Sequence, residues 1–141
     1  MARIVAIDYG RARIGLAMTD EAKKIGMPYK TIASGKTIAL SAKNVIDALK
    51  LFLPHIEKFV LGLPLMLSGK KGEMALEVEQ FKVELEKITD IPVFLWDERL
   101  TSAQAESSLK EMNLTRKKRA QKSDPVAACI ILQNFLEASQ N

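Results

Sequence analysis

Two short stretches of this sequence, residues 3–7 and 58–63, are apolar at almost every position instead of at alternate ones. That pattern is typical of strands that are buried on both faces, inside a sheet that helices cover. Between the two stretches, Val45, Leu49 and Phe52 recur at helical spacing. Strands and helices that alternate in this way predict an α/β or α+β chain with a mixed sheet.

The rest of the chain continues the alternation. Residues 13–19 alternate in polarity and follow Gly10, which eases a hairpin turn from the first strand. Polar caps predict two late helices, one opened by Thr101 with Gln104 and one by Asp124 as N-cap before Pro125. In chain order, the predicted elements are strands at 3–7, 13–19 and 29–33, a helix at 38–53 that stops at Pro54, a strand at 58–63, a helix with Met74, Val78, Phe81, Leu85 and Ile88 on one face, a strand at 92–96, and helices at 101–112 and 124–136.

Length and composition bound the class of protein. With 141 residues and 48% hydrophobic composition, the chain fits one globular domain over residues 1–141. No apolar stretch approaches the roughly 20 residues that a membrane helix needs, and the start enters a strand pattern with no signal peptide. One cysteine, Cys129, excludes an internal disulfide, and with His55 as the only histidine a zinc site is not expected. We therefore expect a cytoplasmic protein without a membrane partner.

Three carboxylates stand where predicted elements begin or end. Asp8 follows the first strand, Glu98 follows the strand at 92–96, and Asp124 opens the last helix. If the two strands are parallel, Asp8 and Glu98 reach the same edge of the sheet. Clustered carboxylates bind divalent cations, and two cations about 3.5–4 Å apart catalyse phosphoryl transfer. The pattern predicts a metal-dependent phosphodiester nuclease.

Each acid also has a purely structural interpretation. Asp124 before Pro125 is a routine helix cap, although one carboxylate oxygen can cap while the other binds a cation. Asp8 can be a turn residue, and Glu98 can form a surface ion pair with an arginine such as Arg11, Arg13 or Arg99. Asp97 is not expected to join Glu98, because adjacent strand residues point to opposite faces.

Basic residues gather near two of these acids. The net charge is +4, and residues 116–122, directly before Asp124, contain no acid. We expect this run and the first turn to contact phosphates, with a plain surface role as the alternative; the residues are Arg11, Arg13, Arg116, Lys117, Lys118, Arg119 and Lys122. The acid-rich stretch 73–86 is expected to face water. Phe94 and Trp96 are expected in the core, and an aromatic content of 6% argues against binding of single strands by base stacking.

Four motifs in order resemble one family over nearly the whole chain. They are Asp8-Tyr9-Gly10 with residues 13–17, Gly62-Leu63-Pro64-Leu65, residues 97–101 (DERLT), and Asp124 with residues 127–133. Together they resemble the YqgF family, also called RuvX, of Holliday junction resolvase-like proteins and pre-16S rRNA nucleases.

The resemblance implies an RNase H-like fold, in which helices flank a five-stranded mixed sheet with an opening antiparallel meander followed by parallel strands. It implies hydrolysis of nucleic acid with Mg²⁺ or Mn²⁺, Asp8, Glu98 and Asp124 being the catalytic metal ligands, and maturation of the 5′ end of 16S rRNA. One loop departs from the family pattern: Met66-Leu67-Ser68 replaces a more polar stretch, which puts substrate contact by this loop in doubt.

Other functions stay open at this point. The same site can act on branched DNA as a Holliday junction resolvase, or the chain can be a non-catalytic regulatory protein that binds nucleic acid. An actin-like ATPase shares the opening hairpin but needs a second domain, for which 141 residues leave little room. The sequence gives no basis for an oligomeric state.

Overall fold

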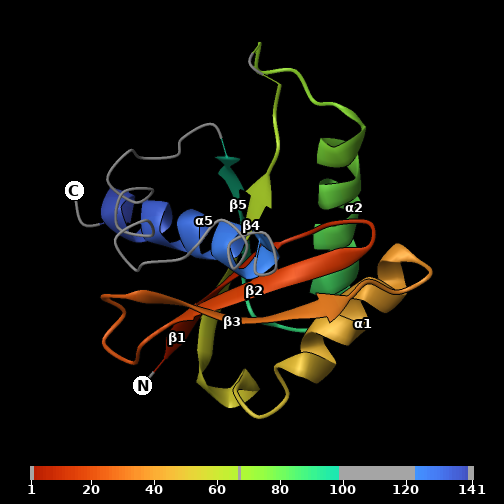
Figure 1. The fold of residues 1–141 in the computed structure, drawn as a ribbon. Coiled ribbons are helices and arrows are strands. Elements are labelled where there is room, and N and C mark those ends of the chain that lie inside the picture. The colour runs from red at the N-terminus through yellow and green to blue at the C-terminus, as the bar shows by residue number, and fades with distance from the viewer. Residues whose placement is uncertain (1, 67, 99–122, 140–141) are drawn as a thin grey trace.

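The computed structural model describes residues 2–66, 68–98 and 123–139, and it builds them around one mixed sheet (Figure 1). The strands lie in the order β3-β2-β1-β4-β5. Pairing is antiparallel between β1 and β2 and between β2 and β3, but parallel between β1 and β4 and between β4 and β5. The predicted five-stranded sheet, a meander followed by parallel strands, is confirmed. The strands are β1 (Arg3–Asp8), β2 (Arg13–Thr19), β3 (Gly26–Ala33), β4 (Ile56–Leu63) and β5 (Val93–Asp97).

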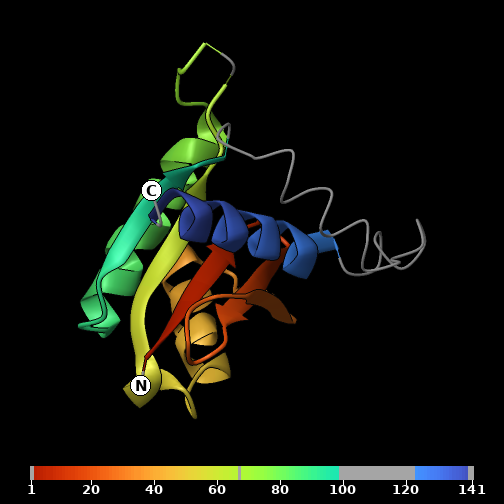
Figure 2. The same ribbon diagram turned by 90° about the vertical axis from the view of Figure 1, so that its left-hand side faces the viewer.

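Helices cover both faces of the sheet (Figure 2). Helices α1 (Ile38–Ala48) and α2 (Glu73–Ile88) pack on one face, and α5 (Ser123–Ser139) packs on the other. In β1, Val5 and Ile7 belong to the core beneath α1 and α2, whereas Ile4 and Ala6 belong to the core beneath α5. Because successive strand residues point to opposite faces, a strand between two helical layers must be apolar throughout, as the sequence indicated.

The first helix is shorter than predicted. α1 ends at Ala48, and Pro54 lies within a short 3-10 helix, η1 (Leu53–His55), instead of stopping α1. The apolar spacing still buries Leu49 and packs Phe52 against the core, so the side-chain pattern survives although the backbone turns. Proline is compatible with the start of a helical turn, where its missing N–H has no partner to lose.

Three further expectations need correction. β3 starts at Gly26 and includes Pro28, which is tolerated because β3 is an edge strand with an irregular register at this point. Ile88 at the end of α2 is 48% exposed and does not join the buried face of that helix. Phe94 is 46% exposed on the other edge strand, where its ring lies against Lys58 Nζ, whereas Trp96 packs against the core beneath α5.

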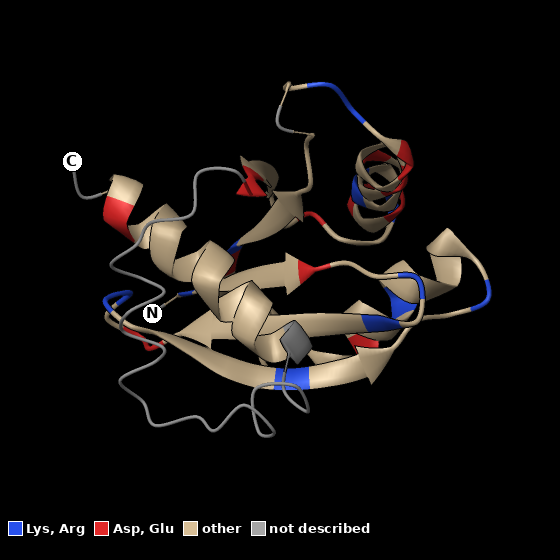
Figure 3. Cartoon of the chain, turned by 45° about the horizontal axis from the view of Figure 1, so that its top comes forward, with Lys and Arg blue, Asp and Glu red and all other residues tan. Residues whose placement is uncertain are grey.

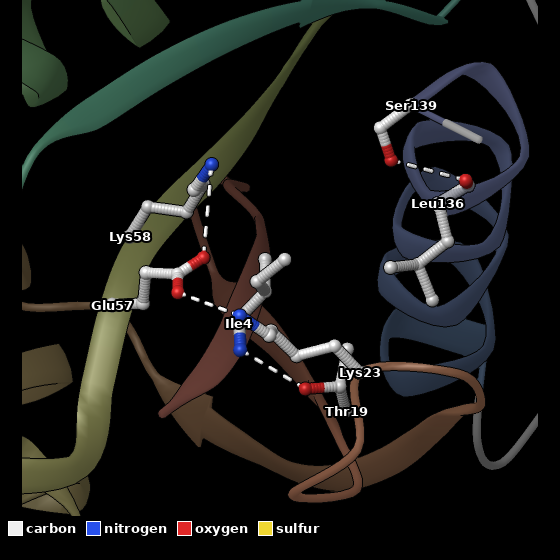
Figure 4. Close-up of polar contacts among 7 residues, drawn as sticks. All are labelled: Ile4, Thr19, Lys23, Glu57, Lys58, Leu136 and Ser139. Carbon is white, nitrogen blue, oxygen red and sulfur yellow. Dashed lines mark hydrogen bonds and ion pairs between the residues drawn. The ribbon is translucent and has the colours of Figure 1, made fainter. Parts of the chain in front are cut away.

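Polar contacts tie together the end of the sheet where β1 starts (Figure 4). The backbone N–H of Ile4 donates to the buried Thr19 Oγ1 at 3.0 Å, which joins the start of β1 to the end of β2. Glu57 in β4 accepts from Lys23 Nζ at 2.8 Å and lies 3.7 Å from Lys58 Nζ. The opposite end of the sheet, where β1, β4 and β5 finish, carries Asp8 and Glu98.

Cys129 in α5 is buried, and burial raises the pKa of its thiol to about 11. None of the helices in the described ranges has the length and apolar character that crossing a membrane requires. The helix predicted at 101–112 lies outside the described residues.

Candidate active site

Asp8 is the last residue of the central strand, β1, and lies at the edge where the parallel strands end. Ile7 pairs with Leu61 of β4, which places Asp8 beside Gly62. Alternation along β1 puts Asp8 on the same face as Ile4 and Ala6, the face that α5 covers. Asp8 therefore has the predicted position, held by the backbone of a central strand.

Glu98 follows β5 directly, and its carboxylate lies over Gly62. A Cβ atom built on Gly62 would stand 2.7 Å from Glu98 Oε1 and 2.5 Å from the Cδ1 atom of Ile131 in α5. Gly62 is thus a required glycine because the space above it is filled by a carboxylate and by the helix. The side chain of Glu98 reaches back from β5 across β4, on the same sheet face as Asp8.

The environment of Glu98 opposes its negative charge. Burial raises the pKa of the Glu98 carboxyl above its usual value, and the charge of neighbouring Asp97 raises it further. Glu98 is therefore partly buried at the end of β5 and not an exposed surface group. Asp97 pairs with Leu63, a residue of the core on the α1 and α2 side, so alternation directs Asp97 away from the face that holds Glu98.

Asp124 lies in the first turn of α5, which begins at Ser123, one residue earlier than predicted. Asp124 is consequently not the N-cap, and Pro125 is still acceptable because N–H groups of the first turn have no partner in the helix. Position 124 precedes Ile131 by seven residues and so shares its helical stripe, about 10 Å along the axis. Among the groups that the structure describes, no three acidic, histidine or cysteine side chains assemble around a common metal position. The side chain of Asp124 lies outside the described groups, so this search does not include it.

Arg11, in the turn after β1, is paired with α2. Its Nε donates to Glu77 Oε2 at 2.7 Å, its Nη2 also contacts that carboxylate, and Glu73 lies 3.5 Å away. The acid-rich stretch that was expected to face water therefore supplies partners for this arginine, and Figure 3 shows acidic and basic residues side by side on α2. Sequence reasoning missed this pairing because 66 residues separate Arg11 from Glu77.

The other basic residues predicted to contact phosphates are Arg13 and those of the run at 116–122. Arg13 is exposed at the start of β2. The run at 116–122 lies outside the described residues, so Arg116, Lys117, Lys118, Arg119 and Lys122 stay predictions. The loop after β4 projects beyond the sheet (Figure 1), and within it Leu65 pairs with Lys71 while Gly69 has a φ of 86°. The positive φ at Gly69 is a conformation that glycine adopts readily, and Met66 is 56% exposed in this loop.

Two solved structures share this fold. RuvC of Thermus thermophilus, solved in complex with a Holliday junction substrate, matches with a TM-score of 0.63 and 14% identity, covering 100% of this chain and 97% of that one. The fowlpox virus Holliday junction resolvase matches with a TM-score of 0.52 and 13% identity, covering 96% and 99%. The order of the strands and the helical layers on both faces of the sheet define an RNase H-like fold.

The chain belongs to the RuvX family, because the family model described as Holliday junction resolvase matches residues 2–138. A Protochlamydia amoebophila protein named putative pre-16S rRNA nuclease is 46% identical over 140 residues, covering 96% of this chain and 93% of that protein. Proteins of the same name from Roseiflexus and Chlamydia abortus are 37% and 40% identical. The resemblance found in the sequence is confirmed.

Proposed function

We propose that this chain is a divalent-metal-dependent endonuclease that matures the 5′ end of precursor 16S rRNA in the cytoplasm, and that residues 1–141 form its single nuclease domain. Its relatives are named putative pre-16S rRNA nuclease, and these names support precursor 16S rRNA as the substrate. One structural observation supports the chemistry above all: Asp8 and Glu98 come from separate parallel strands to one sheet face, with only Gly62 between them. Any residue with a Cβ atom at position 62 would occupy the space that the Glu98 carboxylate fills.

RNase H-like nucleases generally use divalent metals, and the residues present fit Mg²⁺ or Mn²⁺. The fit rests on Glu98, a partly buried carboxylate whose charge is opposed by burial and by Asp97, since a cation would relieve both. In the proposed site, Asp8, Glu98 and Asp124 hold two metal ions. When bound, such ions activate the attacking water and stabilise the leaving oxygen. The strand backbone fixes Asp8, while Gly62 and Ile131 fix the direction from which Glu98 approaches.

The basic residues orient the substrate in this proposal. Arg13 and the run at 116–122 contact backbone phosphates, and Arg11 does so from a position set by Glu77. Changing Lys117, Lys118 and Arg119 together to alanine should weaken RNA binding and lower the slope of log affinity against log salt by roughly one per lost contact. Binding measured by filter retention across a salt series checks this. An unchanged slope would assign the run to plain surface.

The decisive experiment is cleavage of a precursor 16S rRNA fragment, with the 5′ ends mapped in Mg²⁺ and in Mn²⁺. Asp8→Asn, Glu98→Gln and Asp124→Asn should each reduce cleavage at least ~100-fold while RNA binding persists. Asp97→Asn is the matched control, because that side chain points to the other face, and it should cleave normally. Wild-type cleavage no greater than that of the variants would instead identify a non-catalytic binding protein.

Branched DNA is the second candidate substrate, favoured by the fold shared with RuvC and by the description of the family. A four-way DNA junction should be tested beside the rRNA fragment at equal concentration. Paired nicks at symmetric positions of the junction, with no mature rRNA end, would assign the chain to junction resolution.

A further inference from the structure

A polar cavity of about 270 Å³ opens beside Asp8, on the face of the sheet opposite Glu98. Its wall comes from the β1–β2 turn, from the link between β3 and α1, and from α2. The lining residues are Tyr9, Arg11, Gly35, Lys36, Thr37, Ile38, Ser41 and Glu77. Tyr9 follows Asp8 directly and points to this face, with its ring stacked on Phe81 in the core. The cavity and the candidate active site therefore share one edge of the sheet.

The charges around the cavity favour an anion. Two cations, Arg11 and Lys36, and one carboxylate, Glu77, line it, while Glu73 also lies 3.5 Å from Arg11, so Lys36 is the cation that no ion pair neutralises in the described part of the chain. Glu77 is already engaged, because Arg11 donates to it and Tyr9 Oη lies 3.4 Å from its Oε1. Among the described residues, the contacts of Arg11 use Nε and Nη2, so the Nη1 hydrogens have no acceptor there. Within the described ranges Lys36 is exposed and forms no ion pair.

Hydrogen bonds within the link between β3 and α1 fix the part of the wall that Gly35 and Thr37 form. Gly35 donates its N–H to the buried Ser41 Oγ at 2.9 Å, and a Cβ at Gly35 would meet Leu40 Cβ at 2.5 Å, so the link is pressed against the first turn of α1. Thr37 Oγ1 accepts the N–H of Leu40. Because the helix end is capped in this way, the anion preference comes from the two cations. The link holds Lys36 at the cavity mouth.

We propose that this cavity binds a phosphodiester group of the substrate strand, next to the phosphate that is cleaved. The cavity is smaller than the roughly 300–1,000 Å³ of pockets for drug-sized ligands, so it suits a small anionic group. Arginine and lysine are the residues that bind phosphate through charge-assisted hydrogen bonds. A strand whose reacting phosphate lies at Asp8 crosses the sheet edge and places a neighbouring phosphate between Lys36 and Arg11. This subsite rests on the proposed nuclease function and sets the register of the strand at the site.

The test measures binding in EDTA, so that no cleavage intervenes. The probes are precursor 16S rRNA fragments that each carry one uncharged methylphosphonate linkage at successive positions around the mature 5′ end. For the wild type, one linkage beside the cleavage position should weaken binding about tenfold when neutralised. In Lys36→Ala, the same methylphosphonate should cause no further loss of affinity, because the lysine that contacts this phosphate is absent. Lys50→Ala, an exposed lysine beyond the other end of α1, should keep the wild-type pattern.

The outcomes separate the two proposals. If Lys36→Ala keeps the wild-type sensitivity at every linkage while the protein cleaves rRNA with metal, the subsite is overturned and the nuclease function stands. If the sensitivity depends on Lys36 but Mg²⁺ and Mn²⁺ support no cleavage, the subsite stands and the nuclease function fails. A wild type that binds none of the fragments overturns both. Matching melting temperatures of the variants show that each is folded.

Discussion

At the scale of single residues, the candidate site requires a residue without a Cβ atom at position 62. Gly62 lies beside Asp8 in the sheet, and the position that its Cβ would take is occupied by Glu98 Oε1 and by the Cδ1 atom of Ile131. Alanine at this position has two distinct clashes. The clash with Ile131 concerns packing, whereas the clash with Glu98 concerns the direction of a proposed metal ligand.

These two effects can be separated. Gly62→Ala combined with Ile131→Val removes the methyl group that the new Cβ would meet, so its stability should approach that of Ile131→Val alone. Affinity for Mn²⁺, measured by calorimetry, should still be about tenfold weaker than in Ile131→Val, because Glu98 stays displaced. Equal Mn²⁺ affinity in these two variants would show that Gly62 serves packing alone.

The buried thiol of Cys129 gives a second prediction at this scale. Its pKa is raised from 9.0 to about 11 because burial disfavours the thiolate, so at pH 8 the reactive form is roughly 100-fold scarcer than in an exposed cysteine. Native protein should react with an aromatic disulfide reagent very slowly, and protein in guanidinium chloride should react at once. A native rate equal to the unfolded rate would contradict the buried position.

At the scale of elements, the sequence determined well those features that local pattern controls. β1 and β4 were predictable because continuous apolar runs admit few other structures, and β2 because it alternates. The end of α1 and the start of β3 were misplaced, since in both places neighbouring strands and turns override the rule that proline ends an element.

The candidate site divides in the same way. The positions of Asp8 and Glu98 followed from strand ends, which local pattern reveals. The partners of Arg11 and the wall of the cavity could not be predicted, because they join segments far apart in the chain through contacts that leave no periodic signal.

The contact between Glu57 in β4 and Lys23 in the β2–β3 turn joins two elements, and we expect its contribution to stability to depend on pH. The hydrogen bond from Lys23 lowers the pKa of the Glu57 carboxyl below its usual 4.5. A lowered pKa in the folded state means that the contribution to stability is present above the unfolded value and is lost as the pH falls through the folded value. Lys23→Gln should therefore lower the free energy of unfolding at pH 7 by at most about 1 kcal/mol. This difference should shrink as the pH falls from 7 through the folded pKa of Glu57.

Thermal melts across this pH range check the contact between Lys23 and Glu57. Lys36→Gln serves as control, because Lys36 lies toward the other end of the sheet and forms no ion pair among the described residues. A difference between wild type and Lys23→Gln that stays the same size while Glu57 becomes protonated would contradict the assignment.

At the scale of the whole molecule, the fold brings acids from distant parts of the sequence to one edge. Helical layers on both faces bury the strands up to that edge, and the polar contacts around Glu57 and Thr19 hold the far end of the sheet (Figures 2 and 4). Glu98 is held partly buried and next to Asp97, and both features raise the pKa of its carboxyl. A cation bound at the proposed site would relieve both effects.

Metal binding should therefore stabilise the entire protein, and only through these acids. A ligand that binds the folded state at 100 times its Kd adds about 2.7 kcal/mol of stability, so Mn²⁺ at that level should raise the melting temperature of the wild type by about 5–10 °C. Asp8→Asn removes one of the proposed metal ligands, so it should bind Mn²⁺ far more weakly than the wild type. Added Mn²⁺ should leave its melting temperature unchanged, whereas Asp97→Asn, which keeps all three proposed ligands, should still be stabilised by Mn²⁺. Calorimetric melts at constant ionic strength provide the measurement. An equal rise in the wild type and in Asp8→Asn would mean that the cation binds somewhere other than this edge of the sheet.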